Sequence, residues 1–257
     1  MDLGLTGRSA LVCASTGGLG EAVARALAAE GARVAVSGRR GSRARAIAAQ
    51  LPGAIGLEAD LTTEDGPDRL ADAATAGFGP IDVLVLNGPG PKPGSATGTT
   101  VADVDSAVAS LVHPHVRLVA RLLPAMRERG WGRILAIGSS GVAAPIPNLV
   151  LSNLGRAALA GYLKTLAGEV AADGVTVNLL LPGRIATDRV AALDAANAER
   201  SGRDVEAVRR AARAAIPAGR YGDPAEFGAA AAFLCGAPAS YVTGTALRCD
   251  GGLVPAL

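Results

Sequence analysis

At 257 residues, 49% of them hydrophobic and 19% charged, the chain is long enough to bury a large core and too apolar to be disordered. Its 25 Lys and Arg and 23 Asp and Glu leave a net charge of +2, and aromatic residues make up 3%, so we expect no nucleic-acid partner. The first eight residues lack a signal-peptide pattern and no apolar window approaches the roughly 18 residues that span a bilayer, so we expect a cytoplasmic protein without a membrane partner.

Short apolar, β-branched segments alternate with long Ala-, Leu- and Arg-rich stretches of helical period along the whole chain. This alternation predicts βαβ units and a parallel sheet with helices on its faces. Strands are expected at Ser9–Ala14, Arg33–Ser37, Ala54–Ala59, Val83–Leu86, Ile134–Ile137, Thr176–Leu181 and Ala246–Cys249. Helices are expected at Gly18–Glu30, Arg43–Leu51, Glu64–Ala76, Val101–Arg129, Leu149–Ala172 and Pro224–Cys235, with a further helical region from Thr187 to Ala215. Because no linker or repeat divides the chain, residues 1–257 are predicted to form one α/β domain.

The longest stretch without a predicted strand, Arg184–Gly219, is charged and Ala-rich. A sheet of this type would place a lid over a small-molecule substrate at this point. The arginines of this stretch weakly favour an acidic substrate. Arg184 itself would either contact an anionic substrate group or cap the lid.

The three cysteines, Cys13, Cys235 and Cys249, are far apart and without Cys-x-x-Cys spacing. They predict neither a disulfide framework nor a metal site. We expect them to be small buried residues.

The segment Leu11–Gly20 leads from an apolar strand through small residues directly into an amphipathic helix. A pyrophosphate can approach such a backbone and meet the amino end of the helix, so the turn predicts a dinucleotide site. Small residues between a strand and a helix also occur simply to allow close packing. The predicted contacts are Ala14, Ser15, Thr16, Gly18, Leu19 and Gly20.

The second predicted strand ends at Ser37-Gly38-Arg39-Arg40, with no acidic residue where a ribose 2′-hydroxyl would want a carboxylate. Arg39 at this place suits a 2′-phosphate, which favours NADP(H) over NAD(H). The alternative is a pair of solvated surface arginines.

These motifs resemble the short-chain dehydrogenase/reductase family, and the resemblance covers nearly the whole chain. The family's first turn reads Thr-Gly-x-x-x-Gly-x-Gly, of which this chain keeps Gly18 and Gly20 but has Cys13 and Ala14 in the first two places. Further matches are Asp60-Leu61 at the family's adenine-binding pair, Asn87-Gly88 at its Asn-Asn-Ala-Gly element, Pro182-Gly183 with Thr187 at its nicotinamide turn, and the C-terminal Tyr241–Gly244 and Asp250–Gly252. The resemblance implies a Rossmann-type doubly wound sheet of seven parallel strands, bound NADP(H), and a homotetramer or homodimer.

The catalytic residues depart from the family pattern, in which a Ser is followed thirteen positions later by Tyr and four beyond that by Lys. Alignment on Arg156-Ala157-Ala158-Leu159 puts Ser139 at the Ser place, Ser152 at the Tyr place and Arg156 at the Lys place. The family's relay Asn falls near Leu111. An aliphatic hydroxyl is a far weaker acid than a phenol, so Ser152 cannot simply replace Tyr as proton donor. Arg156 keeps the charge and the donors needed to hold ribose hydroxyls, so it is predicted both at the catalytic site and at the cofactor.

Three functions stay open. The first is an oxidoreductase on a carbonyl/alcohol pair, in which the substrate or a water chain through Ser139 and Ser152 supplies the proton. The Ser152-Asn153-x-x-Arg156 pattern with the Gly88–Pro91 loop resembles a ketoacyl-reductase-like subgroup with an atypical tetrad. The second is a non-redox dehydratase, cyclase or isomerase on the same scaffold, and the third is a non-catalytic NADP(H)-binding protein.

Other side chains are weaker candidates. His113 and His115 flank Pro114 within about one turn of Leu111 and would supply an acid, although such histidines are more often ordinary interface or surface residues. Tyr162 lies ten positions after Ser152, about 280° further round a helix, and is expected to pack elsewhere.

Overall fold

Seven strands form a single, wholly parallel sheet in the order β3-β2-β1-β4-β5-β6-β7. The structure is a computed structural model and describes residues 1–255. The strands are β1 (Ser9–Val12), β2 (Arg33–Gly38), β3 (Ile55–Glu58), β4 (Val83–Leu86), β5 (Gly132–Ile137), β6 (Val175–Pro182) and β7 (Ala246–Cys249). This arrangement confirms the predicted doubly wound, seven-stranded sheet.

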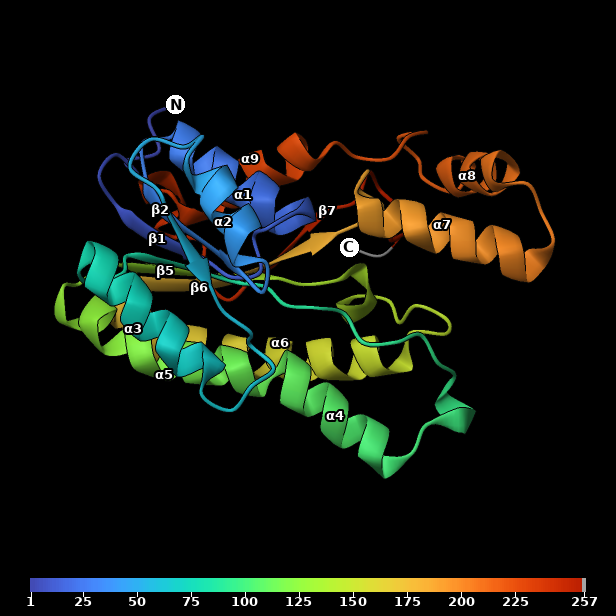
Figure 1. Cartoon of the computed structure of the whole chain (residues 1–257), viewed down its shortest axis with the longest axis horizontal. Coiled ribbons are helices and arrows are strands. Elements are labelled where there is room, and N and C mark those ends of the chain that lie inside the picture. Colours follow the sequence, from blue (N-terminus) through green and yellow to red (C-terminus); the bar gives the residue numbers. More distant parts are fainter. Residues whose placement is uncertain (256–257) are drawn as a thin grey trace.

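The helices between the strands are α1 (Gly18–Ala29), α2 (Gly41–Ala48), α3 (Gly66–Phe78), α4 (Val101–Leu111), α5 (His113–Glu128), α6 (Val150–Val170), α7 (Asp188–Ser201), α8 (Val205–Ala214) and α9 (Pro224–Cys235). In Figure 1, α1, α2 and α9 lie on one face of the sheet, while α3, α5 and α6 lie on the other. The pair α7–α8 stands apart from both layers. Within residues 1–255, no helix combines the length and apolarity needed to cross a membrane.

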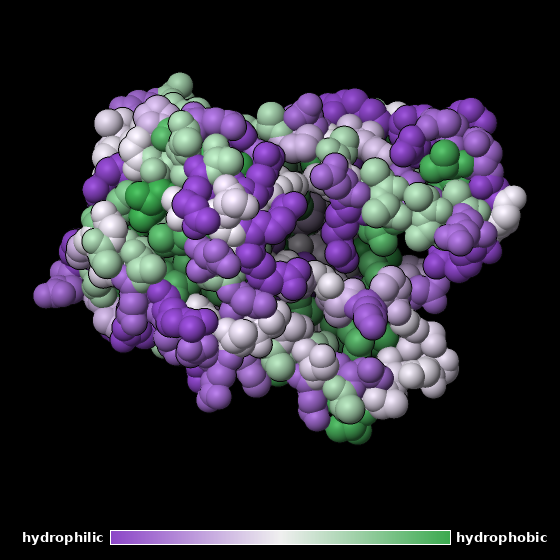
Figure 2. All heavy atoms as spheres, in the orientation of Figure 1, coloured by the Kyte–Doolittle hydropathy of each residue, from purple (hydrophilic) through white to green (hydrophobic). Residues whose placement is uncertain are grey.

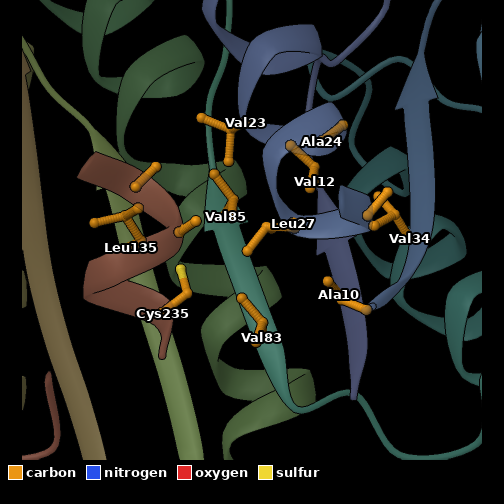
Figure 3. Close-up of a cluster of buried hydrophobic side chains, with 14 of the residues drawn as sticks. Ala10, Val12, Val23, Ala24, Leu27, Val34, Val83, Val85, Leu135 and Cys235 are labelled. Carbon is orange, nitrogen blue, oxygen red and sulfur yellow. The ribbon is translucent and has the colours of Figure 1, made fainter. Parts of the chain in front are cut away.

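Each face of the sheet has its own apolar core, as expected for strands buried on both sides. On the α1 face, Val12, Val83 and Val85 from the strands meet Leu27 of α1 and Cys235 of α9 (Figure 3). On the opposite face, alternate strand residues pack on α3, α5 and α6. The two cores fix the sheet, so the loops at its carboxyl edge stand on a rigid base.

The single helix predicted over Val101–Arg129 is wrong, because the chain there forms two helices, α4 and α5, that meet at Val112. Val112 has a φ of −117° and a ψ of −57°, away from regular helical values. Pro114 stands at the start of α5, where its missing N–H is tolerated, whereas inside one long helix it would remove a hydrogen bond.

The strand order reverses between β1 and β4, which are neighbours in the sheet. In open α/β sheets, ligands bind outside the carboxyl ends of the strands at such a reversal. The residues predicted to bind the cofactor mostly follow the carboxyl ends of β1, β2, β3, β4 and β6. The fold therefore brings them to one edge of the sheet.

Candidate cofactor and active site

The turn after β1 is tied to the end of β4. Asn87 Nδ2 donates to the carbonyl oxygen of Ala14 at 3.1 Å. A Cβ at Gly20 would lie 2.6 Å from the same oxygen, so glycine is what lets α1 approach the turn this closely. Ala14 has a φ of 45°, in the left-handed region that favours glycine. The turn keeps its shape with alanine in that place, and its backbone is strained there.

The predicted contact residues of this turn differ in what their side chains can reach. The hydroxyl of Ser15 is buried, donates to the Val12 carbonyl at 2.7 Å and accepts from the Ser37 N–H at 2.9 Å. Ser15 thus holds β1 to β2. The carbonyl of Thr16 accepts a 2.6 Å hydrogen bond from Arg40 Nη2, so Arg40 is fixed over the turn.

A cavity of about 340 Å³ opens at the ends of β1 to β4. Both Arg39 and Arg40 are exposed and line it, whereas the nearby acid Glu58 turns towards Gly41 and does not. The cavity therefore suits an adenosine with an anionic group attached. Its full lining is Ala14, Thr16, Ser37, Gly38, Arg39, Arg40, Ala59, Asp60, Leu61, Thr62, Asn87, Gly88 and Pro89.

Asp60 is held in this cavity by Thr62, whose N–H and hydroxyl donate to Asp60 Oδ1 at 2.9 and 2.7 Å. The backbone N–H of Thr62, and then its hydroxyl, lower the pKa of the Asp60 carboxyl, and the charge of Arg39 acts in the same direction. Asp60 therefore stays ionised, with its second oxygen available to accept a hydrogen bond from a ligand.

The turn after β6 meets the turn after β1 across the sheet. The Gly183 N–H donates to the Cys249 carbonyl at 2.9 Å. Thr187 caps α7 by accepting from the Val190 N–H at 3.4 Å. The methyl carbon of Thr187 lies 3.8 Å from where a Cβ on Gly18 would stand. The two turns thus form adjoining walls of one site.

The predicted catalytic side chains lie on α6 and on the loop after β5. Ser139 Oγ accepts from the Gly141 N–H at 3.1 Å. Ser152 is half-buried, and its hydroxyl has no hydrogen-bond partner among residues 1–255. Arg156 Nη1 donates to the Ile137 carbonyl at 2.8 Å, which ties α6 to the end of β5. Burial, and then the charge of Arg189, lower the pKa of Arg156 to about 10.

Asn153, beside Ser152, has a structural role. Its Nδ2 donates to the Ile146 carbonyl at 2.9 Å, and its Oδ1 accepts from the Ile146 N–H at 3.2 Å. This pair of hydrogen bonds fastens the loop after Ser139 to α6. The loop that leads from Ser139 is therefore braced against α6, the helix that carries Ser152.

The expectation of a surface or interface residue is wrong for His115, which is 3% exposed. Its Nδ1 lies 2.7 Å from the Leu111 carbonyl, so Nδ1 carries the proton and Nε2 presents a lone pair. Nε2 is buried without a hydrogen-bond partner, and it would lie 3.7 Å from a Cβ on Gly88. Burial lowers the pKa of His115. His113, in contrast, is exposed.

The start of the α7–α8 segment is fastened by a buried carboxylate. Asp194 of α7, 1% exposed, accepts from Arg184 Nη1 at 2.6 Å and from the Tyr221 hydroxyl at 2.8 Å. Of the two roles expected for Arg184, this pairing matches the capping one. Tyr162 packs against the core on the α6 face, away from the site.

A larger cavity, about 830 Å³, lies in a groove between α1 and α9. It reaches the candidate site only at Gly18 and Thr187, and no catalytic candidate lines it. The chemistry-bearing side chains gather instead around the smaller cavity and the cleft beside it. Among the residues that the structure describes, no cluster of acidic, His and Cys side chains could hold a metal ion.

Three features of the site were not predicted from the sequence: the contact of Arg40 with the turn after β1, the burial of His115 and the position of Arg189. Arg40 is the immediate neighbour of Arg39, and a basic pair at a strand end is a signal for both. Pro114 signals the bend between α4 and α5, but the burial of His115 depends on how α5 packs near Gly88. Arg189 has no local signal, because its contact with the Gly90 loop depends on how α7 docks.

Comparison with known proteins extends these observations. A family model described as enoyl-(acyl carrier protein) reductase matches residues 13–254. Nodulation protein G of Rhizobium sp. is 34% identical over 97% of this chain and 98% of its own length. The 3-oxoacyl-[acyl-carrier-protein] reductase MabA of Mycobacterium tuberculosis is 32% identical over 96% of this chain and 92% of its own. L-sorbose reductase of Gluconobacter frateurii, solved with NADPH and L-sorbose, superposes with a TM-score of 0.93 at 30% identity over 100% of both chains.

Proposed function

The chain belongs to the short-chain dehydrogenase/reductase family, and from that premise we propose that it is an NADP(H)-dependent oxidoreductase acting on a carbonyl/alcohol pair. Its relatives include a 3-oxoacyl reductase and a sugar reductase bound to NADPH. The observation that carries the proposal is the cavity at the ends of β1 to β4, whose lining includes Arg39 and Arg40, two residues suited to a ribose 2′-phosphate.

The residues at this edge of the sheet would each contact a different part of the cofactor. The turn from Ala14 to Gly20 would hold the pyrophosphate at the amino end of α1. Arg39 and Arg40 would hold the 2′-phosphate, and Asp60-Leu61 would contact the adenine. Asn87-Gly88 would flank the adenosine ribose, and Pro182-Gly183 with Thr187 would border the nicotinamide. Their common position after the carboxyl ends of the strands supports this division.

The side chains of the catalytic end would orient the substrate and handle the proton. When bound, NADPH supplies the hydride for the carbonyl carbon. Ser139 and Ser152 would donate hydrogen bonds to the carbonyl oxygen, directly or through water. Arg156, one turn beyond Ser152 on α6, would hold the ribose hydroxyls. With a serine in place of the family's phenol, proton delivery is the weak step of this site.

The α7–α8 segment would act as the lid over the substrate. It stands beside the cleft and outside both helical layers (Figure 1), and the Asp194 pairs fasten its base. Its free end can therefore move while its base keeps its place, as a lid requires.

The loss of the family's phenol also supports a second candidate, a non-redox dehydratase, cyclase or isomerase that keeps the nucleotide cleft. Neither Ser152 nor Arg156 reproduces the low-pKa phenol and the ammonium of the family. A fold used for oxidoreduction does not by itself impose that chemistry.

The decisive experiment combines two measurements on the purified protein. Fluorescence titration with NADPH tests the cofactor site, and absorbance of NADPH during incubation with a panel of ketones and ketoacyl thioesters tests hydride transfer. Tight binding with carbonyl-dependent oxidation supports the oxidoreductase. Tight binding without oxidation by any panel member favours the non-redox candidate or a binding protein. Absence of NADPH binding would refute the proposal.

The assembly expected from the resemblance, a homotetramer or homodimer, is part of the proposal. Ala158, Gly161 and Thr165 are small, exposed and at helical spacing on one side of α6, and such a stripe lets a second helix approach closely. Tyr241, shortly before the edge strand β7, is fully exposed, and Leu247 of β7 is also exposed. Sedimentation velocity at micromolar concentration checks the assembly, which a purely monomeric boundary would contradict.

The expected cytoplasmic location is likewise a proposal. It is supported by the three free cysteines, two of them fully buried, since unpaired thiols are typical of reducing compartments. Fractionation of cells that produce the protein tests it, and recovery with the membrane or secreted fraction would contradict it.

A further inference from the structure

Arg189, in the first turn of α7, reaches from the α7–α8 segment to the body of the protein. A Cβ on Gly90 would lie 2.9 Å from Arg189 Cζ and 3.3 Å from its Nη1, so the guanidinium lies against bare backbone. The loop that carries Gly90 follows β4 and is itself fastened, because the Gly94 N–H donates to the Asn148 carbonyl at 2.8 Å. Arg189 thus joins α7 to one wall of the cleft.

A second cation stands near it. Arg156 Nη1 donates to the Ile137 carbonyl at 2.8 Å, so its guanidinium lies at the carboxyl end of β5, next to β4, from which the Gly90 loop departs. In keeping with this position, the charge of Arg189 adds to burial in lowering the pKa of Arg156. Like charges held together raise each other's energy unless an anion lies between them.

Neither guanidinium has a carboxylate partner among residues 1–255. Two other arginines of this region do have one: Arg184 pairs with Asp194 at 2.6 Å, and Arg220 pairs with Glu226 at 2.6 Å. Carboxylates therefore pair with Arg184 and Arg220, but none among the described residues pairs with Arg156 or Arg189. Figure 2 shows the surface hollowed between the α7–α8 segment and the rest of the molecule, with hydrophilic residues on the rim.

We propose that Arg189 binds an anionic group of the substrate, with the positive charge of Arg156 adding to the attraction, so that the carbonyl compound accepted by this enzyme carries a carboxylate. The inference rests on the proposed oxidoreductase function for the reaction, whereas the anion site stands on its own geometry. Guanidinium groups suit this role because they donate in a plane that matches the two oxygens of a carboxylate.

A phosphate of the cofactor is the other anionic group that Arg189 could bind. The residues assigned to cofactor phosphates lie elsewhere, at the turn containing Gly18 and at Arg39 and Arg40. Asp188, next to Arg189, lines the groove between α1 and α9. The Asp188 carboxylate and the Arg189 guanidinium therefore face different sides of α7, because Arg189 lies against Gly90. These positions indicate that the anionic group at Arg189 comes from the substrate and not from the cofactor.

The test compares keto acids with their methyl esters as substrates of the unmodified protein and of Arg189→Gln. Charge-assisted hydrogen bonds of this kind are worth roughly ten- to hundredfold in affinity. The variant should therefore raise the KM of the keto acid by about that factor and leave the KM of the ester and the Kd of NADPH nearly unchanged. Arg210→Gln, at an exposed arginine of α8, is the matched control and should change none of these values.

A second variant perturbs the site without removing the charge. Gly90→Ala adds a methyl where the Arg189 guanidinium lies, so this group must shift. The preference for keto acid over ester should fall in this variant as well. Loss of preference in Arg189→Gln but not in Gly90→Ala would contradict the contact of Arg189 with Gly90 as the basis of the site.

Binding without turnover separates this proposal from the proposed function. Thermal unfolding is followed with NADP⁺ and a short carboxylic acid that has no carbonyl to reduce, beside its amide. The acid should raise Tm in the unmodified protein and in Arg210→Gln, and not in Arg189→Gln, even if no carbonyl compound is ever reduced. The proposal is overturned if acid and amide act alike, or if Arg189→Gln weakens NADPH binding as much as it weakens binding of the keto acid.

Discussion

The Nδ1 of His115 lies 2.7 Å from the carbonyl oxygen of Leu111, across the bend between α4 and α5. This hydrogen bond fixes the neutral ring with its Nε2 lone pair inside the protein. Burial lowers the pKa of His115 from its ordinary value of 6.5, and the charge of Arg156 adds to that effect, while the backbone at Leu111 and Asn87 opposes it.

This environment predicts a pH-dependent stability. Below about pH 6.5 the unfolded chain takes up a proton that the folded His115 resists, so the free energy of unfolding falls as the pH falls. His115→Gln should flatten this dependence, and His113→Gln, at an exposed position, should not. Denaturant midpoints at about pH 5.5 and about pH 7.5 measure the difference. Parallel curves for all three proteins would contradict the assigned state of His115.

Cofactor choice should depend on both arginines after β2. Removing a charge-assisted contact to a 2′-phosphate costs about 1.5–3 kcal/mol, so Arg39→Ala or Arg40→Ala should weaken NADPH binding roughly ten- to hundredfold. NADH affinity should change little in Arg39→Ala, whereas Arg40→Ala should also weaken NADH, because it frees the Thr16 carbonyl and loosens the turn. Calorimetry with NADPH and NADH measures these affinities. Equal affinity of the unmodified protein for the two cofactors would refute the assignment of Arg39 and Arg40 to the 2′-phosphate.

Catalysis towards simple ketones should be limited by proton delivery. General acid catalysis is worth about 10²–10⁴ in rate, so Ser152→Tyr with Arg156→Lys should raise ketone turnover by up to that factor while NADPH affinity stays within several-fold. Leu111 is better left unchanged, because it is buried against Gly155 and a smaller polar residue would open a gap there. Steady-state rates with a ketone panel give the result.

The unmodified protein provides the check on that assignment. If it already reduces simple ketones at ordinary enzyme rates, and Ser152→Ala leaves the rate untouched, the proton comes from another group. His115 is then the first group to test. Its Nε2 presents a lone pair, so it would have to take up a proton before it could deliver one, and His115→Gln should abolish the rate that Ser152→Ala spares.

The strained turn after β1 should respond to glycine. Ala14 has a φ of 45°, which costs a residue with a Cβ about 1–2 kcal/mol, while glycine adds roughly 0.4–1 kcal/mol of entropy to the unfolded chain. Ala14→Gly should therefore raise the free energy of unfolding by up to about 1.5 kcal/mol. Ala10→Gly, in β1, is the control and should lower it. Denaturant unfolding measures both, and a loss of stability in Ala14→Gly would contradict the strain.

The sheet and most of its helices could be predicted because local pattern and burial agree in them. The strands Val83–Leu86 and Ala246–Cys249 and the helix Pro224–Cys235 have the bounds that their apolar runs and end residues indicate. The turn after β1 was also predictable, because its small residues determine how closely the neighbouring backbone segments can approach.

Contacts made by distant segments could not be predicted in the same way. The burial of His115 depends on α5 packing under the end of β4, and the position of Arg189 depends on how α7 meets the Gly90 loop. Composition and spacing describe neighbours along the chain, whereas both of these residues are defined by partners far away in the sequence.

Two of the cysteines, Cys13 and Cys235, are wholly buried, and burial raises the pKa of each thiol to about 12. Thiolate is the form that reacts with alkylating reagents, so both should be unreactive in the folded protein. Cys13 directly precedes the strained Ala14, and its labelling therefore requires the end of β1 and the turn to open. The rate of alkylation at Cys13 thus reports how often the cofactor turn opens, and saturating NADPH should slow it relative to the rate at Cys235.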